Sequence, residues 1–368
     1  MKFNIVIPTR NPKKGSNNFE FILNSNIALN KLIIIDDSTN KSSSKMLEEL
    51  SLKYKPKIIL LNKNILKKIN VPFKLGSYNW NLGNARSLGM MTSLAYSECS
   101  EATIFFDDDI YPTKQTIKIE KNCMRKHYLG KINIQGSPDL SRLEWIELYL
   151  KVRSPNSKVE NIHINRIYYS CKKKSKNLIE KYTDLLPELN EDKITVPQRN
   201  ELSGGAFLCD NKLLKFMLFS NWFDEDWLWF ESCRKTQDAK MINLRFKVFH
   251  NSKIKQILIK KKLLFEENGK IMTTLLKNNQ PINQKNELED IIDQRVRLIN
   301  KILQHFLKIN NKNYSDKKII KELEKLSIEL KNINRTTILK KINNFKGINE
   351  LYLKNKKVYL KNLKKFLK

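Results

Sequence analysis

Residues 102–109 read ATIFFDDD, a strand-forming run that passes directly into three consecutive aspartates. An apolar run of this length with polar residues after it is typical of a strand in the interior of a sheet. A single pair of aspartates after a strand would be explained by turn formation. Three adjacent carboxylates, however, repel one another unless a cation offsets their charge. We therefore expect Asp107, Asp108 and Asp109 to bind a divalent metal ion at the end of this strand.

Further strand-like runs precede this one and alternate with helical stretches. Strands are predicted at 3–8, 31–37 and 57–61, and helices at 19–30, 42–54 and 85–96. The alternation predicts an α/β fold with a doubly wound, mostly parallel, Rossmann-like sheet. Such sheets bind ligands in the crevice beyond the carboxyl ends of their strands. Asp36 and Asp37 end the second strand, so we expect them in the same cleft as the aspartate triplet.

The composition excludes a wholly disordered chain, because 40% of the 368 residues are hydrophobic and 29% are charged. No apolar run approaches the roughly 18 residues that cross a bilayer, and the first run stops at Pro8, too early for a signal-peptide core. We expect a cytoplasmic protein, or one held peripherally at the inner face of the membrane. The five cysteines are scattered and form no CxxC pair, which argues against a disulfide scaffold and a zinc site.

The chain is strongly basic, with a formal net charge of +31 from 69 lysines and arginines against 38 acidic residues. This charge suits nucleic acid, an anionic membrane surface or a phosphate-bearing substrate. Lysine and asparagine abound throughout, so part of the excess can also reflect a compositional bias of the source genome. Charge alone does not choose among these interpretations.

From about residue 284 the pattern changes to long helices. Residues 331–368 contain 12 lysines and arginines and one acidic residue, Glu350, interleaved with apolar and aromatic side chains. A basic amphipathic helix of this kind indicates binding to a membrane surface or docking to a partner. The alternative is a solvated basic face on helices that pack against the preceding domain.

The order and spacing of six motifs carry a resemblance to a known enzyme family. They are 7–11 (IPTRN), 35–39 (IDDST), 82–89 (LGNARSLG), 106–109 (FDDD), 203–205 (SGG) and 225–226 (ED). Together they resemble the family-two glycosyltransferases with a GT-A fold, over about residues 2–255. The resemblance implies a GT-A domain at 1–265, with a nucleotide-sugar half at 1–112 and an acceptor half at 113–265. The basic helical region at 284–368 would follow it.

The resemblance implies that residues after the first two strands hold the base and ribose of a nucleotide. These are Pro8, Thr9, Arg10, Asp36 and Asp37. A carboxylate can accept hydrogen bonds from a base imide or a ribose hydroxyl, and a threonine hydroxyl can donate or accept. Arg86 would face the diphosphate with its planar, permanently charged guanidinium. The alternative for Arg86 is an ordinary arginine on a helix surface.

The aspartate triplet resembles the DxD motif of that family, in which carboxylates hold Mn²⁺ or Mg²⁺ across the two phosphates of the donor. Hard cations prefer oxygen ligands, which Asp107, Asp108 and Asp109 supply. Asp107 and Asp108 would therefore also contribute to donor binding. His250 follows a late predicted strand, where some GT-A enzymes place a further metal ligand; a purely structural histidine is the alternative.

Inverting transfer needs a carboxylate that takes the proton of the acceptor hydroxyl as it attacks the sugar. By resemblance to the acidic pair of the family, Asp226 is the predicted base and Glu225 the alternative, with Asp224 less favoured.

Acceptor-binding roles are predicted for Gly204, Gly205, Trp227 and Trp229. The glycine pair lets a backbone approach a ligand closely or simply forms a tight turn. Trp227 and Trp229, with Trp222 near them, offer flat apolar surfaces to a sugar, or two of the three tryptophans belong to the core.

The leading hypothesis is a metal-dependent glycosyltransferase that moves a sugar, with inversion, from a nucleotide diphosphate-sugar to a hydroxyl. A UDP-sugar donor is favoured, and the acceptor would be a glycan, a lipid-linked glycan or a peptide. One alternative keeps the fold but retains anomeric configuration or transfers a nucleotide. Another is a basic module that binds nucleic acid or anionic lipid. A phosphate-binding module would not place three aspartates at a ligand crevice, so nucleic acid is not the expected partner.

Overall fold

The computed structural model describes most of the chain. The described residues are 2–9, 18–36, 41–62, 82–108, 110–112, 127–136, 143, 146, 205–222, 225–250, 260–277, 285–308 and 314–367. Several predicted site residues lie outside them: Arg10, Asp37, Asp109, Gly204 and Asp224. For His250 the strand is described but the side chain is not.

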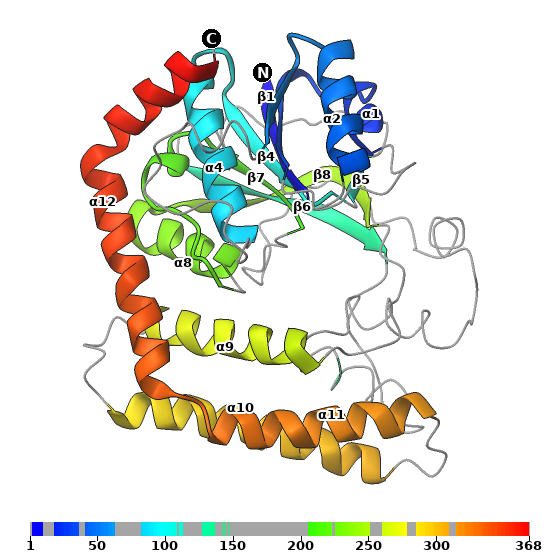
Figure 1. The fold of residues 1–368 in the computed structure, drawn as a ribbon, viewed down its shortest axis with the longest axis vertical. Coiled ribbons are helices and arrows are strands. Elements are labelled where there is room, and N and C mark those ends of the chain that lie inside the picture. Colours follow the sequence, from blue (N-terminus) through cyan, green and yellow to red (C-terminus); the bar gives the residue numbers. More distant parts are fainter. Residues whose placement is uncertain are drawn as a thin grey trace.

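The described residues form an eight-stranded sheet in the order β3-β2-β1-β4-β7-β6-β8-β5 (Figure 1). Its strands are β1 (Phe3–Thr9), β2 (Leu29–Asp36), β3 (Ile58–Leu61), β4 (Ala102–Phe106), β5 (Ile110–Pro112), β6 (Tyr128–Gly136), β7 (Ala206–Asp210) and β8 (Lys240–His250). Neighbours among β3, β2, β1 and β4 are parallel. β7 runs antiparallel to both β4 and β6, and β5 runs antiparallel to β8. The predicted mostly parallel α/β sheet is confirmed, with an antiparallel strand at its centre.

Helices cover both faces of the parallel half. They are α1 (Asn18–Leu23), α2 (Lys41–Lys53), α4 (Leu82–Ala95) and α8 (Glu225–Gln237), with short 3₁₀ turns at Ser97–Cys99 and Leu213–Lys215. Val6, Ile33 and Phe105 pack in one core with α4, whereas the alternate residues Ile5 and Ile34 pack with α1 and α2 in another. Because both faces are buried, these strands are apolar without interruption.

The first helix is shorter than predicted. α1 ends at Leu23, not near residue 30, because the polar residues after it form a turn. The amide of Asn24 donates to the carbonyl of Glu20, and the Ser25 hydroxyl donates to the carbonyl of Ile22. Side chains that bond to the local backbone favour turns over continued helix. β2 therefore starts at Leu29, two residues earlier than predicted.

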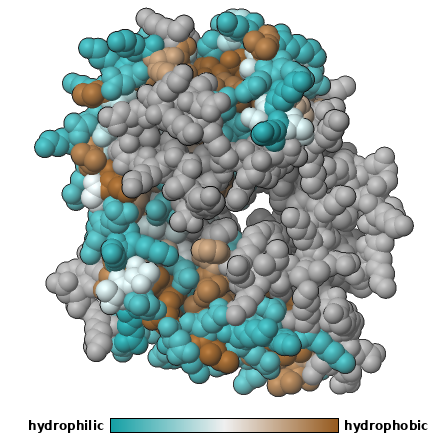
Figure 2. All heavy atoms as spheres, viewed as in Figure 1, coloured by the Kyte–Doolittle hydropathy of each residue, from teal (hydrophilic) through white to brown (hydrophobic). Residues whose placement is uncertain are grey.

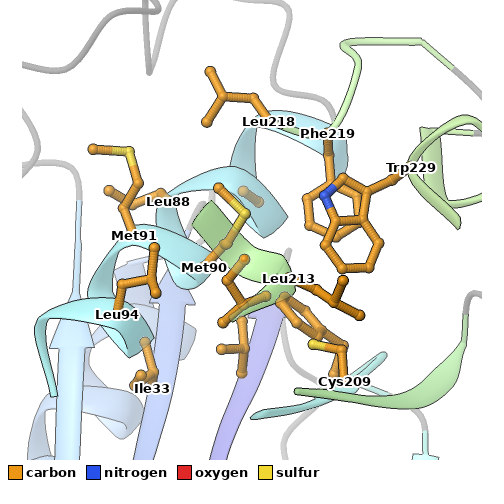
Figure 3. Packing of buried hydrophobic residues seen from close by; sticks show 14 of the residues in the cluster. Ile33, Leu88, Met90, Met91, Leu94, Cys209, Leu213, Leu218, Phe219 and Trp229 are labelled. Atoms are coloured by element: carbon orange, nitrogen blue, oxygen red, sulfur yellow. The ribbon is translucent and has the colours of Figure 1, made fainter. Parts of the chain in front are cut away.

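Helix α4 is buried along nearly its whole length and contacts the sheet at a glycine. A Cβ atom on Gly89 would lie 2.2 Å from Cγ1 of Val6 on β1. Figure 3 shows Leu88, Met90, Met91 and Leu94 of this helix packed near Ile33, Leu213 and Trp229. The absence of a side chain at residue 89 lets the helix lie directly on β1.

The C-terminal region is helical, as predicted. It contains α9 (Lys260–Lys277), α10 (Lys285–Leu307), α11 (Tyr314–Lys331) and α12 (Arg335–Leu367). α9, α10 and α11 share one apolar core, to which Leu263, Ile299 and Leu323 contribute. The predicted domain limit at 265 falls inside α9, so this helical core begins earlier along the chain than residue 284. Among the described helices, none is long and apolar enough to cross a membrane.

We expect Gly89→Ala to destabilise the protein by about 1–3 kcal/mol, the usual cost of overpacking, because the added methyl meets the branched side chain of Val6. Gly347→Ala in α12 is the matched control, since a Cβ there has no heavy atom within 4 Å. The control should stabilise the protein by about 1 kcal/mol through helix propensity. Urea unfolding measures both, and equal effects of the two variants would contradict the close packing of α4 on β1.

Candidate functional site at the carboxyl ends of β1 and β4

Side chains from the first half of the chain meet where β1 and β4 end. Thr9 is the last residue of β1, and its hydroxyl donates to Oδ2 of Asp108 over 2.7 Å. Asp107 and Asp108 directly follow β4, which is the parallel neighbour of β1. The predicted nucleotide residue Thr9 and the predicted metal ligand Asp108 thus share one site, as their positions at adjacent strand ends predict.

Arg86 joins this site to the start of α8. Its Nη2 donates to Oδ1 of Asp107 over 2.9 Å, and its Nη1 donates to Oε1 of Glu225 over 2.5 Å. The Arg86 side chain is only 2% exposed. The alternative of an ordinary surface arginine is therefore wrong. The guanidinium fork bridges two carboxylates that lie 118 residues apart in the sequence, from Asp107 to Glu225.

A second close contact of α4 explains why Arg86 reaches Glu225. A Cβ on Gly83 would lie 1.7 Å from the carbonyl oxygen of Ser220 and 3.3 Å from Cβ of Glu225. The start of α4 therefore touches the segment that leads into α8. Residues three apart share a helix face, so Arg86 lies one turn beyond this contact. The Gly-x-x-Arg spacing in the sequence is the local feature that allows the ion pair.

Burial and charge act against each other at this cluster. Burial lowers the pKa of Arg86, but the carboxylates of Asp107, Glu225 and Asp226 raise it more, so the pKa ends above its ordinary value. For Glu225 burial is the larger effect: it raises the pKa from 4.5 to about 8, although Arg86 lowers it and Asp226 raises it further. A buried acid with a pKa near neutrality and a specific charged partner is typical of functional sites.

Asp226 is buried beside Glu225 in the first turn of α8. Its Oδ1 accepts a hydrogen bond from the backbone amide of Trp227 over 2.9 Å. A carboxylate at a helix N-terminus is stabilised by the unpaired amides and the dipole of the helix. The acidic pair predicted from the sequence is thus connected to Asp107 after β4, because Arg86 binds both Glu225 and Asp107.

Of the three tryptophans near the acidic pair, two are buried and one is partly exposed. Trp229 is fully buried, stacks on Phe219 with ring centroids 5.0 Å apart and donates its indole N–H to the carbonyl of Met217 (Figure 3). The predicted acceptor role of Trp229 is therefore wrong, because its faces are covered by core side chains. Trp222 is also buried, donating to Thr273 of α9. Trp227 alone of these three is partly exposed, so the alternative that two belong to the core is correct.

Other predicted residues take places around the same strand ends. Pro8 precedes Thr9 in β1 and is buried. Asp36 ends β2, next to β1, and accepts a hydrogen bond from the Ser44 hydroxyl of α2 over 2.8 Å. The carbonyl of Gly205 accepts the backbone N–H of Asp107, so Gly205 lies against the end of β4.

The sequence did not predict that Asn18 contacts the aspartate segment after β4. Its Nδ2 donates to the backbone carbonyl of Asp108 over 2.5 Å, and the residue is fully buried at the start of α1. Its Oδ1 is buried too, and within the described chain no hydrogen bond to this atom is found. An asparagine at a helix start looks like a simple cap, so the sequence carried no signal for this contact.

The residues that are described here fit a hard cation in chemistry but do not by themselves complete a metal site. Asp107 and Asp108 supply carboxylate oxygens, and the Asp107 side chain is 30% exposed. His250 pairs in register with Ile110, so the end of β8 lies beside the aspartate segment. Within the described part of the chain, no group of three histidine, cysteine or acidic residues is arranged to hold a metal ion. Asp109 and the His250 side chain lie outside that part.

The sheet order, its single central antiparallel strand and the helices on both faces define an α/β domain with C-terminal helices. No family model and no curated protein sequence matches the chain.

Among solved structures, the chain is similar to Staphylococcus aureus TarS 1-349, with 12% identity and a TM-score of 0.41 over 90% of this chain and 92% of that chain. The same fragment in complex with UDP-GlcNAc gives a TM-score of 0.42 at 12% identity, over 96% and 92% of the two chains. A mycobacterial protein gives a TM-score of 0.40 at 12% identity, over 76% and 75%.

We expect Arg86→Met to destabilise the protein by about 3–5 kcal/mol, because it leaves a buried and a partly buried acidic side chain without their common partner. Arg86→Lys should recover only part of this loss, since one ammonium cannot span both carboxylates as a guanidinium does. Arg234→Met is the control: it breaks the more exposed pair with Glu231 and should cost less than about 1 kcal/mol. Urea unfolding at pH 7 measures all three. A similar loss in Arg86→Met and Arg234→Met would show that the bridge does not organise the site.

The raised pKa of Glu225 predicts a pH dependence of stability. Between the ordinary value of 4.5 and the folded value of about 8, the folded protein holds a proton that the unfolded chain releases. The free energy of unfolding should therefore fall as the pH rises through this window, by about 1.4 kcal/mol per pH unit from this group. Glu225→Gln, which cannot ionise, should remove that part of the slope in unfolding measured at several pH values. An unchanged slope would contradict the pKa shift.

Proposed function

We propose that this protein transfers a sugar from a nucleotide diphosphate-sugar to an acceptor hydroxyl. The observation that carries the proposal is the Arg86 bridge, which joins Asp107 after β4 to Glu225 at the start of α8. A donor-binding carboxylate and a candidate base must meet at one place for group transfer, because the reacting atoms have to be held a few ångströms apart. The motif resemblance gives the class of reaction, and the geometry of the described residues supports it.

The donor nucleotide would lie across the ends of β1 and β2. Thr9 and Asp36 end these neighbouring parallel strands, and both side chains are buried and hydrogen-bonded, which holds their polar groups in place. Pre-organised acceptors and hydroxyls of this kind suit a base and a ribose. Arg10 and Asp37, next to them in sequence, belong to the same proposal, as does the preference for a UDP-sugar.

A divalent ion, Mn²⁺ or Mg²⁺, would be held by Asp107, Asp108 and Asp109, with His250 as a further ligand. The carboxylate oxygens after β4 and the pairing of His250 with Ile110 support this ligand set. Such an ion supplies charge that offsets the negative charge developing on the departing diphosphate. Arg86 neutralises part of the same acidic cluster and holds Asp107 in position.

Asp226 is the proposed general base. Glu225 gives one of its oxygens to Arg86, whereas Asp226 accepts at Oδ1 from a backbone amide and has Oδ2 to receive a proton. In the proposed step the acceptor oxygen forms a bond to the anomeric carbon, the bond from that carbon to the diphosphate breaks, and the acceptor proton passes to Asp226. Attack from the face opposite the diphosphate inverts the anomeric centre. Trp227, partly exposed next to Asp226, would border the acceptor.

We expect Asp226→Asn to keep donor binding and to lower transfer by about 100-fold or more, because an amide cannot take the proton. A thermal-shift panel of UDP, GDP and their sugars, with and without Mn²⁺, measures binding, since a ligand of the native state raises the unfolding temperature. NMR of the product measures transfer and its anomeric configuration. Asp210→Asn is the matched control: Asp210 is similarly buried, but on β7 it caps the amide of Lys212.

Two outcomes would contradict the proposal. If no nucleotide diphosphate-sugar raises the unfolding temperature of the wild type, the donor assignment fails. If Asp226→Asn transfers sugar within tenfold of the wild type, the base assignment fails while the function stands.

A further inference from the structure

The long helix α12 carries a charge bias that the proposed reaction does not use. Its 33 residues contain ten lysines and arginines and a single acid, Glu350. After Glu350 no acidic residue follows in the helix. The neighbouring α11 is different, with five lysines and four acids, among them the ion pair of Lys325 with Glu322. The bias is therefore a property of α12 and not of the helical region in general.

Contacts on the inner side fix which face of α12 points outward. Near its start, Ile338, Ile342 and Phe345 pack into the core of the helical region, and farther along, Tyr352, Tyr359 and Leu363 pack into the core that contains α4. Polar contacts add to this: Asn349 accepts from the amide of Leu218, and Lys364 pairs with Glu98. Figure 1 shows the helix running along one side of the whole molecule. It cannot rotate about its axis without breaking both sets of contacts.

The outward face combines a row of lysines with exposed apolar side chains. Lys354, Lys357, Lys361 and Lys365 are all exposed, and their spacing of three and four residues places them in one line along the helix. Beside the row lie Leu351 and Val358, whose exposed fractions are 46% and 56%. Figure 2 shows hydrophilic and hydrophobic residues together along the margin where α12 runs in Figure 1. We call this set of six residues the α12 outer face.

We propose that the α12 outer face docks the protein onto an anionic membrane surface. The four lysines would lie over lipid headgroups, and the two apolar side chains would enter the interface between headgroups and acyl chains. The row extends over about 16 Å at 1.5 Å per residue, which suits a flat surface. The mixture of lysine with exposed leucine and valine favours a membrane over nucleic acid, where arginine contacts and stacked aromatic rings are the rule.

The test uses the full chain and sedimentation with vesicles of 30% phosphatidylglycerol and 70% phosphatidylcholine. Replacing Lys354, Lys357, Lys361 and Lys365 with Gln should weaken binding by at least about 50-fold, because each lysine near an anionic surface contributes about fivefold. The matched control replaces four exposed lysines elsewhere, namely Lys45, Lys55, Lys57 and Lys321, and should weaken binding by less than about fivefold. Both variants lose the same net charge.

A third variant, Leu351→Ser with Val358→Ser, should weaken binding even in high salt, since it removes apolar contacts that salt does not screen. Four results would overturn the proposal. The wild type could fail to bind anionic vesicles, or it could bind pure phosphatidylcholine as well as the anionic mixture. The control could lose as much binding as the α12 variant, which would assign the effect to net charge alone. Tighter binding of duplex DNA than of vesicles through the same four lysines would assign the face to nucleic acid.

Discussion

The site depends on one guanidinium that bridges two acidic side chains. Arg86, itself buried, donates from one nitrogen to the partly exposed Asp107 and from the other to the buried Glu225. Its rigid, planar fork holds one partner on each side. The neighbouring elements α4 and β4 and the distant helix α8 therefore have one relative position in which both contacts of Arg86 are made. The relative position of α4, β4 and α8 therefore sets the distances between the reacting groups for any reaction at these strand ends.

Helix α4 packs closely on its neighbours because two of its residues, Gly83 and Gly89, have no side chain. At Gly89 the helix touches β1, and at Gly83 it touches the segment before α8, so the two glycines set its depth and its direction. Nearly every other residue of α4 is buried, which is why the helix lacks the apolar and polar sides that usually mark a helix in a sequence. The rigidity of this packing gives Arg86 a defined place.

The sequence predicted the strands better than the site. β1, β2 and β4 were found because burial on both faces leaves a continuous apolar run, and their carboxylates were placed correctly at the strand ends. The pairing of Arg86 with Glu225 joins residues 139 positions apart, and no local pattern reports such a contact. Trp229 was misassigned for a related reason: tryptophan suits both a sugar face and a core, and only the packing against Phe219 decides.

Helix α12 contributes side chains to two hydrophobic cores, which affects the order in which the protein can fold during synthesis. This helix leaves the ribosome after every other element described here, yet it supplies Tyr352 and Tyr359 to the sheet side and Ile342 to the helical side. Until it arrives, apolar surface on both sides stays open to water and to other nascent chains. Neither core is therefore complete until the last helix has been made.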